Sequence, residues 1–432
     1  MKLPKLINHV SSFQFYQVFR YGALIIISIL FAKSHLSIGE IGNYETLMLI
    51  SSAVSSFWVA GLMNSMLALY KHDENKSSFF FNSFLLILIF NSIVVLLMIA
   101  FKTNIQDIVQ QKEIHYYNIL LLFIFLNTPS FLIEHILLLK KQSHAIIIYG
   151  TIIYTLQVII VVAPIFFGYS IEASIYGLII VSIIKLIILF YLLIKNSTFE
   201  IHGKAMNKHL QFAAPLMASA LFSGSADYID GIIVTKNFDS STFAIFRYGA
   251  RELPFTLLMA NAMSVALVPV VASGLLENSL KEIKQRSARL MHLLFPVTIV
   301  LLLVSKWLYP IVFNPKFQGS ADVFNIFLML IISRMIFPQT ILIGLRKTRI
   351  IMFAAFIEML INIAFSLIFL QYFGLMGVAY GTIIAYFSEK LILLFYSYYI
   401  LKIKPSDYIP ITVLTAYSAI LIICYFLVER YF

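Results

Sequence analysis

The sequence has little charge and almost no cysteine. Of its 432 residues, 12% are Asp, Glu, Lys or Arg, whereas 61% are hydrophobic. Soluble domains are nearer one quarter charged and one half apolar. This composition therefore excludes a soluble fold, and the single cysteine, Cys424, excludes an internal disulfide.

Sequence motifs of soluble enzymes are also missing. The chain has no phosphate-binding GxxxxGK[ST] loop, no GxGxxG fingerprint, no HExxH pair and no cysteine pattern with metal-ligand spacing. We therefore expect no cofactor, no metal and no catalytic site, so the protein is not predicted to be an enzyme. Without an ATP site, any transport would draw on an ion gradient, the membrane potential or the substrate gradient.

Long apolar runs are abundant. A helix needs about 20 mostly apolar residues to cross a bilayer, and the backbone of such a run must satisfy its own hydrogen bonds. We predict an all-α polytopic membrane protein. Its thirteen expected segments are roughly 12–33, 44–70, 79–101, 116–139, 146–168, 173–195, 209–234, 242–273, 288–312, 322–345, 349–371, 375–401 and 409–428.

The basic residues indicate the orientation. Eighteen Lys and Arg residues fall in loops on one side of the predicted segments and seven on the other. The positive-inside rule then places the N-terminus in the cytoplasm. The net charge of +11 is thus a topology signal, and we expect no nucleic-acid partner. No small-residue cleavage site follows the first apolar run, so we expect its helix to be retained.

An internal repeat divides the chain. SIYGLIIVSIIKLIILFY (174–191) matches VAYGTIIAYFSEKLILLFY (378–396), and 137–177 aligns with 341–381 without a gap. The two copies have the same orientation, which predicts parallel repeats with a site at their interface. The expected domains are a six-helix lobe at 1–195, a cytoplasmic linker at 196–208, a second six-helix lobe at 209–401, and an extra helix and tail at 402–432.

Six basic residues lie inside the predicted helices, where charge is costly and commonly functional. They are Arg20, Lys185, Arg247, Arg251, Arg334 and Lys390. The pentapeptide FRYGA contains two of them, Arg20 and Arg247. Arg20 lies roughly 12 Å into the first helix. We read it as a cation lining a cavity for an anionic headgroup; the alternative is a structural pair with a carboxylate or a helix end.

A second group of charges flanks one predicted hairpin. Asp227 and Asp230 are three residues apart, while Arg247 and Arg251 are four apart, so each pair shares a helix face. Glu252 follows. This group is either a buried salt-bridge network or a site that also meets substrate or a coupling ion.

The remaining intramembrane charges are weaker candidates. Lys185 and the Glu389–Lys390 pair occupy equivalent places in the repeat. Glu134, Arg334 and Glu358 have no partner that can be named from sequence. A structural role is at least as good an interpretation for each of them.

Three stretches resemble the polysaccharide transporters, or O-antigen flippases, of the multidrug/oligosaccharidyl-lipid/polysaccharide exporter superfamily. They are FRYGALIIISILFAKSHLSIGEIGNYETLMLI (19–50), DGIIVTKNFDSSTFAIFRYGARELPFTLLMANAMSVALVPVVAS (230–273) and GLRKTRIIMFAAFIEMLINIAFSLIFLQYFGLMGVAYGTIIAY (344–386). The resemblance extends to about residue 400. The thirteenth segment departs from the twelve or fourteen spans common in relatives.

This resemblance implies two six-helix lobes forming a V around a cationic cavity. It also implies a flippase that carries undecaprenyl-diphosphate-linked oligosaccharide from the inner to the outer leaflet of a bacterial cell (inner) membrane by alternating access. Arg20 matches the cavity arginine of the family's first helix; Asp230, Arg247 and Arg251 match its other charged positions more loosely. The expected partners are that glycan lipid, membrane lipids, H+ or Na+ as coupling ion, and other polysaccharide-assembly proteins.

Two alternatives stay open. A multidrug extruder of the same superfamily would expel amphipathic cations, and its cavity should be acidic rather than arginine-bearing. A membrane polysaccharide polymerase or ligase would need a sizeable external loop that carries catalytic Arg or His residues. The longest external loop, about 102–115, has neither the size nor a constellation of such residues.

Overall fold

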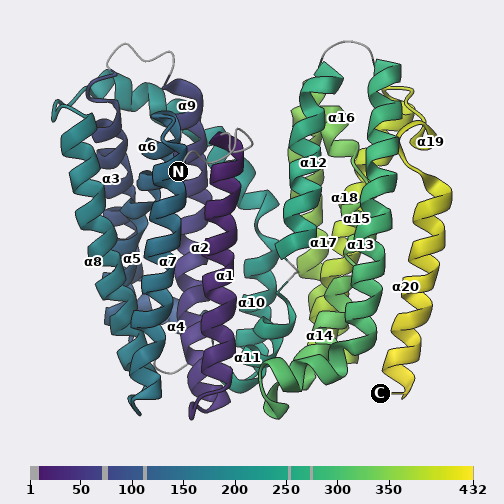
Figure 1. Cartoon of the computed structure of the whole chain (residues 1–432), viewed down its shortest axis with the longest axis horizontal. Coiled ribbons are helices and arrows are strands. Elements are labelled where there is room, and N and C mark those ends of the chain that lie inside the picture. Colours follow the sequence, from purple (N-terminus) through teal and green to yellow (C-terminus); the bar gives the residue numbers. More distant parts are fainter. Residues whose placement is uncertain (1–8, 71–75, 110–113, 252–253, 273–275, 432) are drawn as a thin grey trace. The chain divides into compact units, whose positions relative to one another are not determined.

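The computed structural model describes residues 9–70, 76–109, 114–251, 254–272 and 276–431, and every regular element among them is a helix (Figure 1). Within these ranges a few residues, Asp227 among them, have a described backbone only. The α-helices are α1 (His9–Ala32), α2 (Ile38–Leu69), α3 (Phe79–Ala100), α4 (Lys102–Ile108), α5 (Tyr117–Asn127), α6 (Leu132–Leu139), α7 (Ser143–Phe166), α8 (Ile171–Asn196), α9 (Gly203–Ser223), α10 (Ala226–Asn237), α11 (Ser240–Gly249), α12 (Pro254–Ala272), α13 (Leu276–Val312), α14 (Gly319–Leu328), α15 (Ile331–Arg334), α16 (Pro338–Gly344), α17 (Thr348–Phe373), α18 (Leu375–Tyr399), α19 (Pro405–Tyr408) and α20 (Ile411–Tyr431). Two 3-10 turns, η1 (Thr128–Phe131) and η2 (Pro315–Phe317), complete them.

Ten helices in the described ranges are long and apolar enough to cross a membrane, and a bent pair formed by Gly319–Arg334 and Pro338–Gly344 gives an eleventh. The prediction of a multi-pass helical membrane protein is confirmed. The prediction of continuous helices over 209–234, 242–273 and 322–345 is wrong. The segment 209–234 is interrupted at Gly224, and the segment 242–273 is interrupted after α11. Polar and charged residues lower the hydropathy of both stretches. The segment 322–345 bends by 44° before Pro338.

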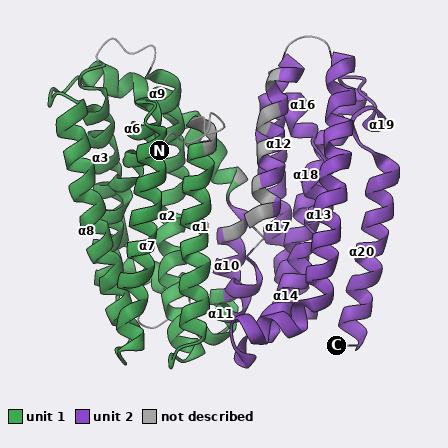
Figure 2. Ribbon diagram, viewed as in Figure 1, with its two compact units in different colours: residues 1–224, 235–244 green, residues 225–234, 245–432 purple. Residues whose placement is uncertain are grey.

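By compactness the chain forms two units (Figure 2). Unit 1 comprises residues 1–224 and 235–244, and unit 2 comprises 225–234 and 245–432. The lobe limits expected from the repeat remain a prediction.

Close helix contacts in unit 1 depend on glycine. A Cβ atom at Gly150 of α7 would lie 2.9 Å from Cδ2 of Tyr16 on α1, and one at Gly61 of α2 would lie 2.7 Å from the backbone nitrogen of Met217 on α9. Real Cβ atoms do not approach other heavy atoms so closely. The α1–α7 and α2–α9 contacts therefore require these two glycines.

In unit 2, α17 and α18 pack along their length, and a Cβ atom at Gly377 or Gly381 would overlap the α17 backbone. The last helix, α20, packs on α13. Tyr417 stacks on Phe295 with ring centroids 5.2 Å apart and contacts His292 Nδ1 at 3.0 Å. The thirteenth expected segment is thus a helix of spanning length held against unit 2.

The repeat is visible in backbone detail. Lys141 and Arg346, 205 residues apart, both adopt the left-handed conformation, with φ of 56° and 58°. Each follows a short helix, and the residues after them, Gln142 and Lys347, donate to the carbonyls of Leu137 and Leu342. These are matching Schellman-type helix ends.

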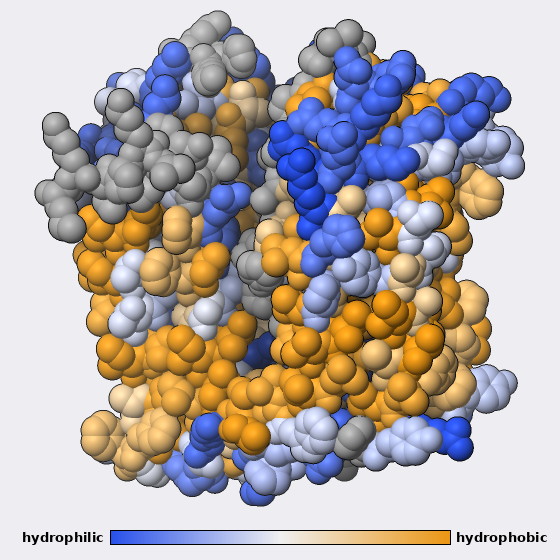
Figure 3. Space-filling view, turned by 45° about the vertical axis from the view of Figure 1, so that its right-hand side comes forward, coloured by the Kyte–Doolittle hydropathy of each residue, from blue (hydrophilic) through white to orange (hydrophobic). Residues whose placement is uncertain are grey.

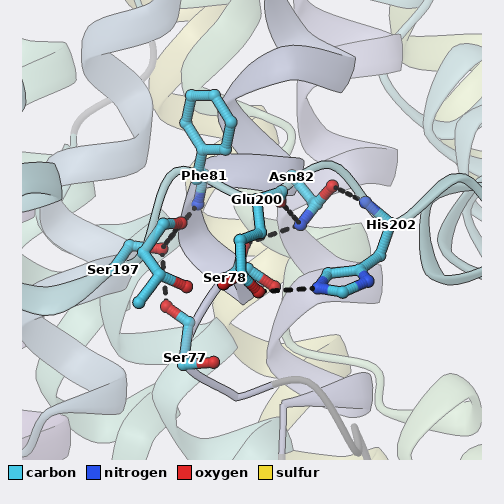
Figure 4. Close-up of polar contacts among 8 residues, drawn as sticks. Ser77, Ser78, Phe81, Asn82, Ser197, Glu200 and His202 are labelled. Atoms are coloured by element: carbon cyan, nitrogen blue, oxygen red, sulfur yellow. Dashed lines mark hydrogen bonds and ion pairs between the residues drawn. The ribbon is translucent and has the colours of Figure 1, made fainter.

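The segment after α8 is fixed to the start of α3 (Figure 4). The Asn82 side chain donates to the Glu200 carbonyl at 3.0 Å and accepts from the His202 amide at 2.9 Å. The Ser197 hydroxyl donates to the Ser77 carbonyl at 2.9 Å. Residues 197–202 of the expected linker are therefore held against unit 1 by hydrogen bonds.

The exposed surface is largely apolar over the middle of the helices. Figure 3 shows a broad hydrophobic band with hydrophilic side chains toward both ends of the visible face. Large exposed residues such as Leu96, Ile187, Val300 and Phe426 contribute to this surface. Such a band is the expected contact with lipid chains.

Candidate functional site

The first candidate site is a polar cluster inside unit 1. Arg20 of α1 is half-buried, and its Cζ lies 4.8 Å from the ring centroid of Phe131. Phe131 ends η1, the 3-10 turn that interrupts the fourth predicted segment at Pro129. Arg20 forms no hydrogen bond or ion pair with any described residue. Its guanidinium keeps its hydrogen-bonding capacity for another group.

Glu134 of α6 is the carboxylate of this cluster and is 3% exposed. The hydroxyl of Tyr16 on α1 donates to it, and the hydroxyls of Tyr16 and Tyr154 lie 2.8 Å apart. The Tyr149 ring stacks on Tyr16 with centroids 6.0 Å apart. A carboxylate buried in this way must be hydrogen-bonded or paired, and the Tyr16 hydroxyl donates such a hydrogen bond to it.

Lys185 of α8 supplies a second cation and is 8% exposed. Its ammonium donates to Asn127 Oδ1 and Gln157 Oε1, both at 3.3 Å, and lies 5.5 Å from the Tyr154 ring centroid. Amide dipoles stabilise an ammonium without cancelling its charge. The described residues of the cluster therefore hold two cations, Arg20 and Lys185, against one carboxylate, Glu134.

The second candidate site lies in unit 2 around Asp230 of α10, which is 3% exposed. Thr382 of α18 donates to one carboxylate oxygen, and Asn362 Nδ2 of α17 donates to the other at 3.1 Å. The amide oxygen of Asn362 is buried without a hydrogen-bond partner in the described chain. Glu358, 5% exposed, precedes Asn362 by one helical turn. Asp230, Asn362 and Thr382 thus form one buried hydrogen-bonded group.

The other charged candidates at this predicted hairpin are Arg247, Arg251, Asp227 and Glu252. Arg247 belongs to α11, while the Arg251 guanidinium lies 4.9 Å from the ring centroid of Tyr248. The Asp227 side chain and all of Glu252 lie outside the described residues. A salt-bridge network across this hairpin stays a prediction, and Asp230 accepts hydrogen bonds from side chains of α17 and α18.

The last candidates meet at the bend before α16. Arg334 lies 4.8 Å from the ring centroid of Tyr386, and Gln339 donates to Glu389. Lys390 forms an ion pair with Glu389 at 3.1 Å, and both side chains are buried. Unlike Lys185, its counterpart in the repeat, Lys390 has a carboxylate beside it.

Sequence reasoning missed the neutral partners in both sites. Tyr16 binds Glu134 and is itself hydrogen-bonded to Tyr154. Gln157 and Asn127 bind Lys185, and Asn362 and Thr382 bind Asp230. One signal was present: Gln157 and Asn362 are 205 residues apart, which is the repeat offset. Among the described residues no group of three His, Cys, Asp or Glu side chains could hold a metal ion.

The helix arrangement defines a membrane protein with a transporter-type fold. The lipid II flippase MurJ, in an inward closed conformation, matches with a TM-score of 0.72 and 18% identity over 96% of this chain and 93% of the flippase. A MATE-family multidrug resistance transporter of the MOP superfamily, in an inward-facing conformation, matches with a TM-score of 0.71 and 13% identity over 91% of this chain and 98% of the transporter. A MOP-superfamily transporter from Pyrococcus furiosus, described as having a binding pocket of reverse polarity, matches with a TM-score of 0.61 and 14% identity over 93% of this chain and 99% of the transporter.

The particular family follows from sequence. No curated protein matches the chain. The family model described as polysaccharide biosynthesis protein matches residues 36–322, more than half of the chain. The chain belongs to this family, which confirms the resemblance to polysaccharide transporters inferred from the sequence.

Proposed function

We propose that the protein is a flippase for a polysaccharide repeat unit carried on undecaprenyl diphosphate, moved from the inner to the outer leaflet of a bacterial cell membrane by alternating access. The observation that carries this proposal is the unit 1 cluster, where Arg20 and Lys185 face only one carboxylate, Glu134. Excess positive charge inside a membrane protein favours an anionic ligand. The polysaccharide biosynthesis family and the transporter fold agree with such a cargo.

Arg20 is the proposed ligand of the diphosphate. A guanidinium can donate two parallel hydrogen bonds to a phosphate group and so replace water that the diphosphate loses inside the protein. The Arg20 guanidinium contacts the Phe131 ring and forms no hydrogen bond or ion pair with any described residue, so its N–H donors are available. Lys185, in the same cluster, adds long-range attraction, while the lipid tail stays in the bilayer.

Asp230 is the proposed coupling site for H+ or Na+. A buried carboxylate, a threonine hydroxyl and an amide oxygen without a donor are the kinds of oxygen ligand that a hard cation takes. If the ion is a proton, Asp230 itself would carry it; Glu358 lies on α17, one helical turn before the Asp230 partner Asn362. Arg247 and Arg251 are proposed to contact the cargo in a later state, and other polysaccharide-assembly proteins are proposed to receive it.

The test is complementation of a strain that lacks the gene. Wild type, Arg20→Ala, Arg20→Lys and a control, Lys33→Ala, would be compared at equal membrane levels; Lys33 is exposed just after α1. We expect surface glycan to fall at least roughly tenfold with Arg20→Ala, because a charge-assisted hydrogen bond contributes about 1.5–3 kcal/mol. Lipid-linked repeat units should accumulate at the same time.

Full surface display by Arg20→Ala at wild-type protein level would overturn the assignment of Arg20. Export of amphipathic cations with no change in surface glycan on deletion would instead favour a multidrug extruder. Accumulation of single, already translocated repeat units would favour a polymerase or ligase.

A further inference from the structure

The first part of α13 carries a charged stripe that the transport proposal does not use. Helix α13 has 37 residues, Leu276–Val312, and is about 55 Å long at 1.5 Å per residue. The hydrocarbon core of a bilayer is about 30 Å thick. Several turns of α13 must therefore extend beyond the hydrocarbon.

Those turns have two different faces. Ser279, Leu280, Ile283, Ser287 and Leu290 are buried in unit 2. The opposite face carries side chains at spacings of three and four residues, which makes a single stripe on the helix. The stripe consists of Asn278, Lys281, Glu282, Gln285, Arg286 and Arg289, and these six line a hollow of about 410 Å³.

The stripe is basic on balance. Glu282 pairs with Arg286 at 2.5 Å, and Glu277, beside the stripe, pairs with Lys281 at 2.8 Å. Arg289 forms no ion pair with any described residue, and the residues one turn away from it include no acid. Arg289 is exposed and is the last of the six lining residues along the helix.

The same helix face becomes apolar directly after Arg289. Leu293 is 47% exposed and Val300 is 57% exposed. Charge therefore gives way to lipid-facing aliphatic side chains within one turn. This change places Arg289 at the level where phosphate headgroups lie. Figure 3 shows hydrophilic side chains gathered at one end of the visible face, above the hydrophobic band.

We propose that the α13 stripe is a binding site for the headgroup of an anionic phospholipid. The acyl chains would lie along Leu293 and Val300, and the phosphate would accept hydrogen bonds from Arg289 and Lys281. Arg286, already held by Glu282, would close the hollow on one side. Arginine suits this role because its planar donors match phosphate oxygens.

The test uses the purified full chain in nanodiscs of phosphatidylcholine with increasing phosphatidylglycerol, and counts retained lipids by native mass spectrometry. Arg286→Gln/Arg289→Gln would be compared with Lys204→Gln/Lys208→Gln, which removes two exposed charges from α9. Each basic residue near an anionic surface contributes about a fivefold gain in affinity. We expect roughly 30-fold weaker phosphatidylglycerol retention in the α13 variant and little change in the control.

All four side chains are exposed, so both variants should fold, and circular dichroism with gel filtration checks this. Unchanged phosphatidylglycerol retention in the α13 variant would overturn the proposal. Equal losses in the two variants would overturn it too, because they would indicate a non-specific charge effect. Competition by undecaprenyl phosphate but not by phosphatidylglycerol would assign the stripe to the cargo lipid and also contradict the proposal. None of these outcomes depends on transport activity.

Discussion

Lys185 and Lys390 occupy equivalent positions of the internal repeat, 205 residues apart, yet their ammonium groups have different partners. Lys390 pairs with Glu389 at 3.1 Å, whereas Lys185 donates to the amide oxygens of Asn127 and Gln157 at 3.3 Å. The charge of Lys390 is thus neutralised by a neighbouring carboxylate, whereas Lys185 keeps its charge beside two neutral amides.

Removing the two lysines should therefore have unequal effects on stability. Lys390→Met leaves the buried Glu389 carboxylate without its cation, which costs about 3–5 kcal/mol. Lys185→Met leaves only two amide oxygens without a donor and also removes a buried charge, so we expect about 1–3 kcal/mol at most. Thermal unfolding in detergent measures both. Equal losses, or a larger loss for Lys185→Met, would contradict the charge assignment.

Tyr16→Phe tests the hydrogen bond to Glu134. The substitution keeps the ring contacts with Tyr149 and removes the hydroxyl that serves both Glu134 and Tyr154. A buried acceptor left without its donor costs about 1–3 kcal/mol. Tyr21→Phe, whose side chain is 43% exposed, is the matched control and should change the melting temperature little. Indistinguishable melting of the two variants would show that the Tyr16 hydroxyl does not stabilise the cluster.

Two glycine-to-alanine changes should act in opposite directions. A Cβ atom at Gly381 would overlap Ser366 on α17, so Gly381→Ala must separate α17 from α18 and lower stability. A Cβ atom at Gly22 of α1 would meet nothing within 4 Å, so Gly22→Ala should raise stability by about 0.5–1 kcal/mol through helix propensity. Thermal unfolding of both variants measures the signs, and a stabilised Gly381→Ala protein would contradict the packing of unit 2.

Asp230→Asn should separate transport from its coupling ion. The amide keeps the size of the carboxylate and can still accept from Thr382, so the fold should be retained. Flipping in proteoliposomes should lose its response to Na+ or pH gradients. Asp239→Asn, at an exposed carboxylate that accepts from the Thr242 amide, is the control. A full gradient response in Asp230→Asn would rule out Asp230 as the coupling residue.

The sequence was sufficient to predict the helical class, most of the helices and the repeat, because these depend on runs and spacings of apolar residues. Pro129 and Pro338 are local signals for the interruptions in the fourth and tenth expected segments, which are defined by the length of their apolar runs. The partner of Glu134 could not be predicted. Tyr16 is 118 residues away, and nothing in the local sequence of either residue specifies that contact.

The neutral partners of the charged residues could not be assigned from the sequence either. Asn362 and Thr382 complete the surroundings of Asp230, and both are ordinary polar residues within apolar helices. Their position becomes meaningful only once α10, α17 and α18 are brought together. The charged residues of each candidate site could therefore be named from the sequence. Their neutral partners depend on how distant helices pack together.

The left-handed residues that end α6 and α16 reveal a conflict between two requirements. Glycine would adopt this conformation without strain, whereas Lys141 and Arg346 each incur about 1–2 kcal/mol. Both are also charges that the positive-inside rule counts. A chain optimised for folding alone would exchange them for glycine and lose two of the signals that orient its hairpins during insertion. Correct delivery into the bilayer and maximal stability within it thus favour different residues at the same positions.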